Sequence, residues 1–319
     1  MRSLAALILG FFLDLLVGDP RWIPHPVVRI GRLTDVMEKA MRRIFPKTVQ
    51  GENFAGLAIW LIVVTVSTAV PFGILLLGNS VSPWLGFALE TVMCAQILAT
   101  KSLRQESMKV CDALKTGDLK KAQYAVSGIV GRDTARLDEK GVAKAAVETV
   151  AENTSDGVIA PMLYLAVGGA PLGFFYKAVN TMDSMLGYVE MPYKNIGLVP
   201  AKMDDVFNFL PARISGLLML AAGTILGMDG KNGWKIFCRD RGNHASPNSA
   251  QTESVCAGLL DLQLAGDAWY HGVLHKKQFI GDPIREIESA DIPRACRLLY
   301  GTAFLGLLLF AGLKLWFLI

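Results

Sequence analysis

The sequence has few charged residues, few histidines and no cysteine pattern that points to a metal site. Charged residues make up 19% of the 319 residues, against 52% hydrophobic ones, and the mean hydropathy is +0.38. A soluble domain usually has about 25% charged residues. The five cysteines include no Cys-x-x-Cys pair, which argues against a disulfide framework and a zinc site. The formal net charge of +4 is too small to indicate nucleic-acid binding.

The common nucleotide-binding and hydrolase signatures are also missing. The chain contains neither GxxxxGK[ST] nor GxGxxG, so neither a P-loop nor a Rossmann domain is indicated. GxSxG is absent, and the four histidines lack the HExxH spacing. We find no internal repeat and no run of strands. An enzyme of this sequence must therefore use another arrangement of residues.

Long apolar runs are the main positive feature. A helix needs about 20 apolar residues to cross a bilayer, and the second and sixth runs reach this length, while the third nearly does. We expect an all-α, polytopic membrane protein with about four full transmembrane helices. The runs are Leu4–Val17, Phe54–Gly78, Val81–Ala99, Gly157–Tyr176, Ile214–Met228 and Leu298–Ile319.

The first run has two interpretations. It follows Arg2 and has the length of the hydrophobic part of a signal peptide. Asp14 interrupts it, however, and the GDPRW that follows is a poor cleavage site. We therefore expect an uncleaved membrane anchor.

Three polar stretches rich in Lys and Arg, residues 18–53, 100–156 and 229–297, separate the runs, whereas the short connection 78–83 has no basic residue. The positive-inside rule places such basic stretches in the cytoplasm. The sequence thus predicts a single membrane-embedded domain over residues 1–319 in the cell membrane. Its cytoplasmic side carries a helical insertion at 100–156 and a loop region at 229–297.

Runs 157–176 and 214–228 leave two topologies open. The first of them contains Pro161, Gly168, Gly169 and Pro171, which break a helix unless neighbouring protein satisfies its backbone. If both runs cross the bilayer, residues 177–213 lie outside; if neither crosses, they lie inside.

The stretch AENTSDGVIAP (151–161) places two carboxylates beside an apolar run. An Ala-rich helix over 134–151 is expected to end there, with Glu152 and Asp156 at its C-terminus. The helix dipole already presents negative charge at that end. The misfit suggests a compensating metal ion or basic side chain; the alternative is a solvated turn.

Further polar clusters border the other runs. Asp14, Asp19 and His25 are candidates because ionisable groups in membrane segments are costly, although Asp19 also fits an interfacial turn. On a helix, Lys177, Asn180 and Ser184 share one face beside Asp183, and Asp204 and Asn208 lie one turn apart with Asp205 adjacent. Such oxygen-rich clusters suit Mg²⁺, although any single Asp also fits a helix cap.

The stretch RDRGNHASPNSAQTE (239–253) is a candidate phosphate site. Asn248 or Ser249 is expected to cap a helix that begins near Ala250. His244 and two arginines precede this helix N-terminus, which presents free N–H groups. An ordinary capped helix with a basic flank is the alternative. From the residues alone, the chain is a polytopic, Mg²⁺-dependent enzyme that handles phosphate groups at the cytoplasmic face.

Several long motifs, in this order, resemble the CobD/CbiB family of adenosylcobinamide-phosphate synthases of cobalamin (vitamin B12) biosynthesis. The resemblance runs nearly end to end. The motifs are LDLLVGDPRWIPHPVVRIGRL (13–33), IVGRDTARL (129–137), VETVAENTSDGVIAP (147–161), GGAPLGFFYKAVNTMDSMLGY (168–188), KMDDVFNFLPAR (202–213), RDRGNHASPNS (239–249) and IGDPIREI (280–287).

The resemblance implies ATP- and Mg²⁺-dependent amide formation between adenosylcobyric acid and (R)-1-amino-2-propanol O-2-phosphate or a close analogue. It implies contact with the lipid bilayer and suggests contact with later membrane enzymes of the pathway. It also favours runs 157–176 and 214–228 as re-entrant or buried segments, because the substrates are cytoplasmic. The active site would then face the cytoplasm.

Residue roles follow motif by motif under the resemblance. The expected metal ligands are Glu152, Asp156, Asp183, Asp204 and Asp205. The expected catalytic residues are Glu152, Asp156, Lys177, His244 and Asp19, of which His244 or Asp19 is the base. The expected substrate-binding residues are Asp14, His25, Asn153, Asn180, Arg213, Ser246, Asn248 and Ser249.

Two other function classes stay open. A membrane transferase acting on diphosphates would use the same Asp-rich segments, with NTMD and DDVFN as its metal-binding motifs. A transporter would use Asp14 and Glu90 as ion ligands within the membrane, although transporters often have repeated halves.

Overall fold

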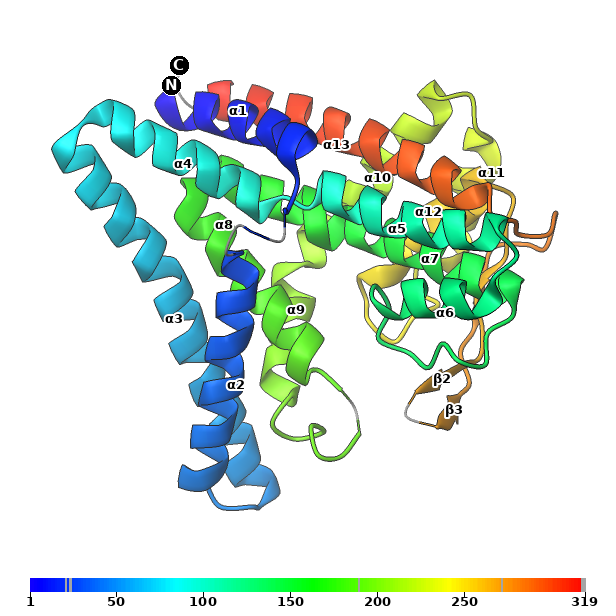
Figure 1. Ribbon diagram of the computed structural model, residues 1–319, viewed down its shortest axis with the longest axis horizontal. Coiled ribbons are helices and arrows are strands. Elements are labelled where there is room, and N and C mark those ends of the chain that lie inside the picture. The colour runs from blue at the N-terminus through cyan, green and yellow to red at the C-terminus, as the bar shows by residue number, and fades with distance from the viewer. Residues whose placement is uncertain (21, 23–24, 189, 271, 317–319) are drawn as a thin grey trace. The chain divides into compact units, whose positions relative to one another are not determined.

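The computed structural model describes residues 1–20, 22, 25–188, 190–270 and 272–316 (Figure 1). In the described residues, each of the six apolar runs is mostly helical, which confirms the predicted all-α class. The helices are α1 (Arg2–Val17), α2 (Pro26–Ile44), α3 (Val49–Val81), α4 (Pro83–Ile97), α5 (Thr100–Lys115), α6 (Leu119–Ser127), α7 (Glu139–Thr154), η1 (Ser155–Ile159), α8 (Ala160–Leu186), α9 (Leu198–Phe207), α10 (Phe209–Ile225), α11 (Gly230–Asp240), α12 (Ser249–Leu259) and α13 (Asp291–Trp316).

Three helical segments in the described part of the chain are long and apolar enough to cross a membrane: Val49–Val81, Glu139–Leu186 and Asp291–Trp316. The pair Leu198–Phe207 and Phe209–Ile225, bent by 49°, is a fourth if it forms one span. The first and third apolar runs form α1 and α4, which have only 16 and 15 residues. The protein is therefore a helical membrane protein, and the re-entrant nature of 157–176 and 214–228 stays a prediction.

The segment Glu139–Leu186 departs from a regular α-helix at two places. The π-helical segment η1 ends at Ile159, two residues before Pro161. Proline has no N–H to donate to a carbonyl oxygen of the preceding turn. The chain also breaks at Gly168 and Gly169, where Gly169 has φ 64°, a conformation that favours glycine. The predicted Gly/Pro break is thus confirmed within α8.

One expectation about this segment is wrong. Glu152 and Asp156 do not lie at a helix C-terminus, because α7 continues through η1 into α8. The argument that a helix dipole calls for a cation there therefore fails. If Glu152 needs a neighbouring cation, the reason must be repulsion from other carboxylates and not the dipole of a helix end.

The chain divides into two compact units: unit 1 contains residues 1–99, 160–208 and 309–319, and unit 2 contains 100–159 and 209–308. The predicted single domain over residues 1–319 stays a prediction. In unit 1, α2 packs along α3, and α4 folds back on α3 after Ser82 (Figure 1). Helix α1 approaches α4 closely, since a Cβ at Gly10 would lie 2.5 Å from Cys94 Cβ.

In unit 1, a half-buried polar contact joins α1, α4 and the C-terminal part of α13. Ser3 Oγ donates to Glu90 Oε1 at 2.8 Å, and Lys314 Nζ donates to Ser3 Oγ at 2.9 Å. Hydrogen bonds of this kind satisfy ionisable side chains that apolar helices would otherwise leave unpaired. Glu90, the ion ligand of the transporter alternative, is therefore engaged in holding α1, α4 and α13 together.

Helix α12 forms the centre of unit 2. Every residue from Ser249 to Leu259 is buried, and the helix packs on α7, α10 and α11. Small residues allow these close approaches: a Cβ at Gly258 would lie 2.7 Å from Gly233 Cα on α11. Helix α12 is therefore held on several sides, which fixes the polar side chains that it carries.

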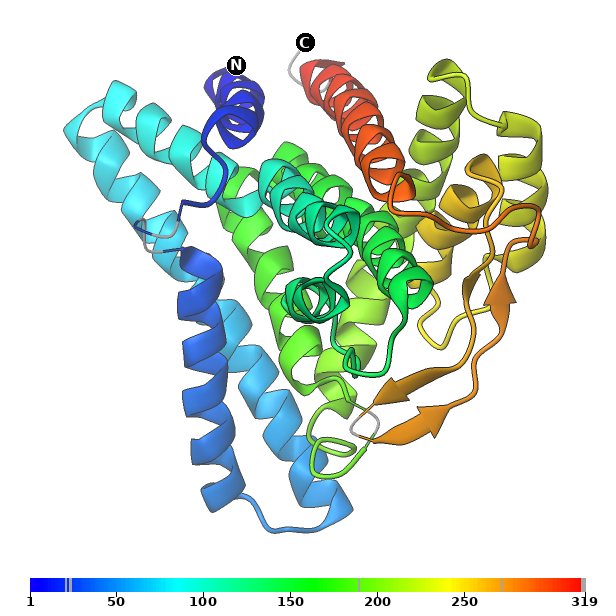
Figure 2. The ribbon, with the colours of Figure 1, turned by 45° about the vertical axis from the view of Figure 1, so that its right-hand side comes forward.

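Unit 2 also contains short strands that the sequence analysis missed. Strands β1 (Leu264–Ala265) and β4 (Phe279–Ile280) pair antiparallel, as do β2 (Ala268–Tyr270) and β3 (Val273–His275) (Figure 2). Each strand has only two or three residues, too few to show a period-two pattern in the sequence. The predicted loop region 229–297 thus contains two helices and these strands, and the beginning of α13.

The close approach of α12 to α11 predicts a stability cost for a single methyl group. A Cβ at Gly258 would lie 2.7 Å from Asn232 O, so Gly258→Ala is expected to lower the free energy of unfolding by about 1–3 kcal/mol. The matched control is Gly73→Ala in α3, where a Cβ meets nothing within 4 Å. Thermal unfolding in detergent should show a lower Tm for Gly258→Ala only; equal Tm values would contradict the close approach.

Candidate functional site

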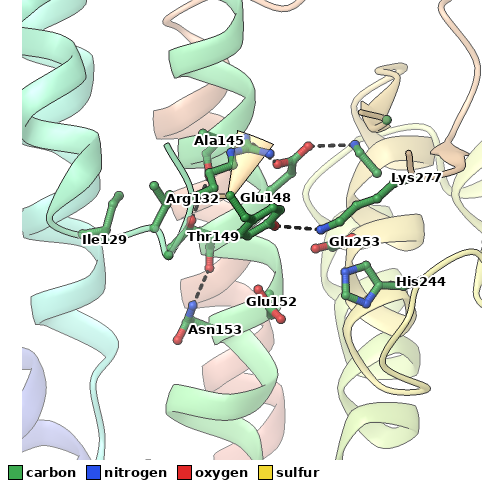
Figure 3. Close-up of a pocket in the computed structure, with 15 residues that line it drawn as sticks. Ile129, Arg132, Ala145, Glu148, Thr149, Glu152, Asn153, His244, Glu253 and Lys277 are labelled. Carbon is green, nitrogen blue, oxygen red and sulfur yellow. Dashed lines mark hydrogen bonds and ion pairs between the residues drawn. The ribbon is translucent and has the colours of Figure 1, made fainter. Parts of the chain in front are cut away.

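One face of α7 lines a small, polar cavity of about 140 Å³ in unit 2 (Figure 3). Ala145, Glu148, Thr149, Glu152 and Asn153 line it and recur three or four residues apart, the spacing that places side chains on one side of a helix. The N-cap Asp138, which accepts from Gly141 N at 2.7 Å, begins this helix. The helical repeat therefore points two carboxylates into one cavity.

Helix α12 supplies a hydroxyl and a third carboxylate, one turn apart. Ser249 Oγ donates to Glu152 Oε1 at 2.7 Å, and Glu253 lines the cavity. The expected N-cap position is confirmed, since α12 begins at Ser249 directly after the N-cap Asn248, although the Asn248 side chain makes no capping hydrogen bond. Asn248 Oδ1 instead accepts from Arg213 Nη1 at 3.2 Å.

Two cationic side chains balance part of this negative charge. Arg132 Nη2 lies 2.8 Å from Glu148 Oε2, while Arg132 Nε has no hydrogen-bond partner among the described residues. Lys277 Nζ donates to Tyr270 Oη at 2.7 Å. Figure 3 shows Lys277 and His244 across the cavity from α7. The cavity therefore combines three carboxylates with cationic donors that can bind an anion.

The backbone at one wall of the cavity is held in an unusual conformation. Ala265 has φ 57° although it is not glycine, a region that side chains other than glycine rarely adopt. Both of its peptide groups are bound from α7: Ala265 N donates to Glu148 Oε1 at 2.7 Å, and Lys144 Nζ donates to Ala265 O at 2.7 Å. Strained positions of this kind concentrate at functional sites.

Burial and like charges act on Glu253. This residue is only 5% exposed, and its burial, together with the charges of Glu152 and Glu148, raises the pKa of the Glu253 carboxyl well above its usual value. Desolvation and a neighbouring negative charge both favour the neutral acid. Glu253 is therefore able to hold a proton inside the cavity at a pH where exposed carboxylates are ionised.

His244 lies at the edge of the cavity in one definite tautomer. Its Nδ1 accepts a hydrogen bond from Ser246 N at 3.1 Å, so the neutral ring carries its proton on Nε2. Burial is the main cause that lowers the pKa of His244. His244 therefore presents an N–H donor, which suits an anion and argues against the predicted role of base.

The remaining predicted residues of unit 2 lie near this cavity or beside it. Asn153 lines it, and its Nδ2 donates to Thr149 O at 3.0 Å. Arg213 and His244 line a second pocket of about 470 Å³, and Ser246 Oγ accepts from Asn248 N at 3.2 Å in the same loop. Asp156 lies in η1 and lines neither pocket.

The other predicted residues belong to unit 1, where two groups meet. Asn180 Nδ2 lies 3.5 Å from Asp204 Oδ1, and Lys177 is buried on the same helix as Asn180. Asp205 pairs with Lys202 at 3.3 Å, and Asp183 O accepts from Gly187 N at 2.7 Å. Their roles as metal or substrate ligands stay predictions.

The N-terminal candidates also lie in unit 1. His25 Nε2 is 3.0 Å from Asp19 Oδ1, and His25 Nδ1 accepts from Val27 N at 3.3 Å. The structure thus brings Asp19 and His25 together at the start of α2. Asp14 is buried in α1, with 2% of its surface exposed.

No cluster of three or more His, Cys, Asp or Glu side chains suited to a metal ion occurs within the described ranges. In the cavity, both oxygens of Glu148 are engaged, by Ala265 N and by Arg132. Glu152 and Glu253 are the carboxylates that remain for a cation. The described protein atoms therefore offer a partial set of ligands.

Sequence reasoning missed the other four charged residues of the cavity: Arg132, Glu148, Glu253 and Lys277. Two of them could have been predicted from the sequence. Glu148 precedes Glu152 by four residues and Glu253 follows Ser249 by four, the spacing that places side chains on one face of a helix. Arg132 lies in the motif IVGRDTARL, which was quoted above only for the family resemblance. Lys277 follows β3 and carried no local signal, since the strands that place it were not predicted.

The buried Glu253 predicts a pH-dependent difference in stability. Because its pKa is raised in the folded protein, stability is lost as pH rises from the usual carboxyl range through the folded pKa. Glu253→Gln removes this loss, so its Tm should exceed that of the wild type by more at pH 8 than at pH 5. Thermal unfolding in chelator-containing buffer measures this difference.

Glu106→Gln on α5 is the control for this prediction. Glu106 is partly exposed and pairs with Lys109, so its Tm difference from the wild type should be nearly the same at both pH values. A Glu253→Gln difference that does not grow with pH would contradict the raised pKa.

The comparisons with known proteins agree with the motifs. The family described as CobD/Cbib protein matches residues 7–299. A relative named "Cobalamin biosynthesis protein CobD" in Geobacter metallireducens is 45% identical over 307 residues, which cover 96% of this chain and 95% of the relative. A protein of the same name in Klebsiella pneumoniae is 43% identical over 314 residues and 98% of both chains.

A third relative, "Cobalamin biosynthesis protein CbiB" of Salmonella arizonae, is 42% identical over 314 residues and again covers 98% of both chains. No solved structure matches this chain. The family match covers most of the sequence, including every segment that lines the cavity of α7 and α12. The chain therefore belongs to the CobD/CbiB family.

Proposed function

We propose that this protein is the adenosylcobinamide-phosphate synthase of cobalamin biosynthesis, a carbon–nitrogen ligase. Relatives over nearly the whole chain are named cobalamin biosynthesis proteins, which supports a role in that pathway. The observation that carries the proposal is the cavity in which Glu148, Glu152 and Glu253 lie beside Arg132 and Lys277. Carboxylates and cations in one cavity suit a reaction that moves phosphate near a metal ion.

The proposed reaction has two steps. A propionate oxygen of adenosylcobyric acid attacks the γ-phosphorus of ATP, and the bond to the β-phosphate oxygen breaks, which gives an acyl phosphate and ADP. The amine of the aminoalcohol phosphate then attacks the acyl carbon. The C–N bond forms, the C–O bond breaks and inorganic phosphate leaves. The cavity of about 140 Å³ suits the reacting groups and not the whole corrinoid.

The residues of this cavity fit a Mg²⁺ ion that is bound partly by the protein and partly by water and substrate phosphates. The ion is usually bound by one or two carboxylates, water and substrate phosphates, and Glu152 supplies one such carboxylate. When bound, it would neutralise phosphate charge. Arg132, whose Nε has no partner in the described chain, is placed to bind a carboxylate or phosphate oxygen from the same cavity.

Proton transfer from the attacking amine needs an acceptor in or near the cavity. His244 presents Nε2–H and therefore fits donation to an oxyanion. Glu253 is the better candidate in unit 2, because a carboxyl with a raised pKa accepts a proton more readily than an ordinary one. The family resemblance also implies Asp19, which lies beside His25 in unit 1, as a candidate base.

Within unit 1, we propose substrate or metal contacts for Lys177, Asn180, Asp183, Asp204 and Asp205. Asn180 Nδ2 lies 3.5 Å from Asp204 Oδ1, which supports a shared role for these two side chains. The three basic stretches of the sequence support a cytoplasmic active site.

The decisive experiment measures ADP release by the purified protein in lipid nanodiscs. We expect ATP consumption only when Mg²⁺, adenosylcobyric acid and the aminoalcohol phosphate are all present, with formation of the amide in equal amount. The phosphate-free aminoalcohol serves as a substrate control. ATP consumption that ignores the corrinoid acid would overturn the proposal and favour another ATP-dependent activity.

Glu152→Gln is expected to lower kcat by roughly 10²-fold, because it removes one fixed charge from the reacting centre. The substitution keeps an oxygen that can accept from Ser249 Oγ, now 2.7 Å from Glu152 Oε1. The exposed Glu106→Gln variant should keep the wild-type kcat. A Glu152→Gln enzyme with normal kcat and normal Mg²⁺ dependence would remove Glu152 from the site.

A further inference from the structure

Unit 2 contains a second pocket that has donors and no carboxylate. It measures about 470 Å³, within the size range of small-ligand sites. Arg213, Arg241, Gly242, His244, Ala245, Pro247 and Gln251 line it. His244 also lines the carboxylate cavity, so the two pockets share one side chain.

The two arginines of this pocket carry charge that no described carboxylate balances. Arg213 bonds only neutral oxygens: Nη1 donates to Phe209 O at 2.7 Å and to Asn248 Oδ1 at 3.2 Å. Arg241 lies 5.2 Å from the centre of the Phe237 ring, and its guanidinium has no ion pair within the described residues. The two guanidiniums line the same pocket and repel each other, so an anion bound in this pocket would be favoured.

Other groups of the pocket add to this preference. His244 presents Nε2–H, because its Nδ1 is occupied by Ser246 N. Helix α12, of 11 residues, begins next to Pro247, and a helix N-terminus favours negative charge. Every charged or titratable side chain that lines the pocket is thus a donor, and these donors match the oxygens of a phosphate monoester.

Gln251 holds the loop that forms this wall. Its side chain is buried, and Nε2 donates to Arg241 O and to Pro247 O, both at 3.2 Å. Two carbonyl acceptors fix the orientation of the amide. The amide therefore ties both ends of the loop 241–247 to α12 and keeps Arg241 close to Arg213.

We propose that this donor pocket binds the phosphate of the phosphorylated amine substrate, while the carboxylate cavity takes the metal-bound nucleotide end of the reaction. The assignment rests on the proposed function. His244 lies between the two sites, so a substrate held by its phosphate in one pocket extends its amine toward the other. Arg213 and Arg241 are binding residues in this arrangement, and Gln251 is a positioning residue.

The test begins with binding alone, without ATP or corrinoid. The protein in nanodiscs is titrated with the aminoalcohol phosphate, with inorganic phosphate and with the phosphate-free aminoalcohol. Arg241→Gln should weaken binding of the ester and of inorganic phosphate by about 10- to 100-fold, the effect of losing a charged hydrogen bond. Binding of the phosphate-free aminoalcohol should not change.

Arg104→Gln is the matched control, since Arg104 is exposed on α5 and lines neither of the two pockets. Arg213→Gln should behave as Arg241→Gln does. If the Arg213→Gln protein unfolds, the binding measurement on Arg241→Gln still tests the proposal, because the Arg241 side chain makes no hydrogen bond in the described structure that the substitution could remove. Gln251→Met should weaken ester binding less than Arg241→Gln and leave the KM for ATP unchanged.

Steady-state kinetics separates the pockets. Arg241→Gln should raise the KM for the ester and leave the KM for ATP near the wild-type value. An unchanged affinity for the ester, or a rise in KM for ATP alone, would overturn the assignment. If the ester binds as expected but ATP consumption is independent of it, the proposed function fails while the phosphate pocket stands.

Discussion

The crowding of three glutamates, one of them buried, around one small cavity is the constraint on which the arrangement of unit 2 depends. Like charges repel strongly where water is excluded, and each carboxylate must find a partner or a proton. Glu148 is held by Arg132 and by Ala265 N, and Glu152 accepts from Ser249. Glu253 has the least support and shows the raised pKa. Ala265, at φ 57°, directs its N–H to Glu148 and so supplies one of these donors.

The helices were predictable because each rests on a signal inside its own segment. An apolar run predicts a helix at its own position. Gly168, Gly169 and Pro171 predicted a break in α8, and Gly169, with φ 64°, explains how the chain makes it. The π-helical η1 and the four short strands were not predictable in the same way. The π-helical η1 changes the helical register by only one residue, and each strand has only two or three residues. Neither feature produces a periodic pattern that can be detected in the sequence.

The site was predictable only in part because its contacts are made across the chain. Glu152, Ser249 and His244 stand in conspicuous polar motifs, and the structure brings them to one cavity. The cationic residues beside them do not stand in such motifs. Arg132 follows α6, and Lys277 follows β3, a strand that no sequence pattern predicted. Helical spacing from the predicted residues would have added Glu148 and Glu253. Only the fold shows which cation meets which carboxylate.

The separation of acceptors and donors on the two sides of His244 has a physical reason. A phosphate dianion placed beside Glu148, Glu152 and Glu253 would be repelled unless a metal ion came with it. A second substrate that carries phosphate but no metal therefore needs its own set of donors. Arg213, Arg241 and His244 provide one, and the neutral His244 adds no negative charge to the wall between them. Under the proposed function, the chain would hold two anionic substrates close together, because only one of them would depend on the carboxylates.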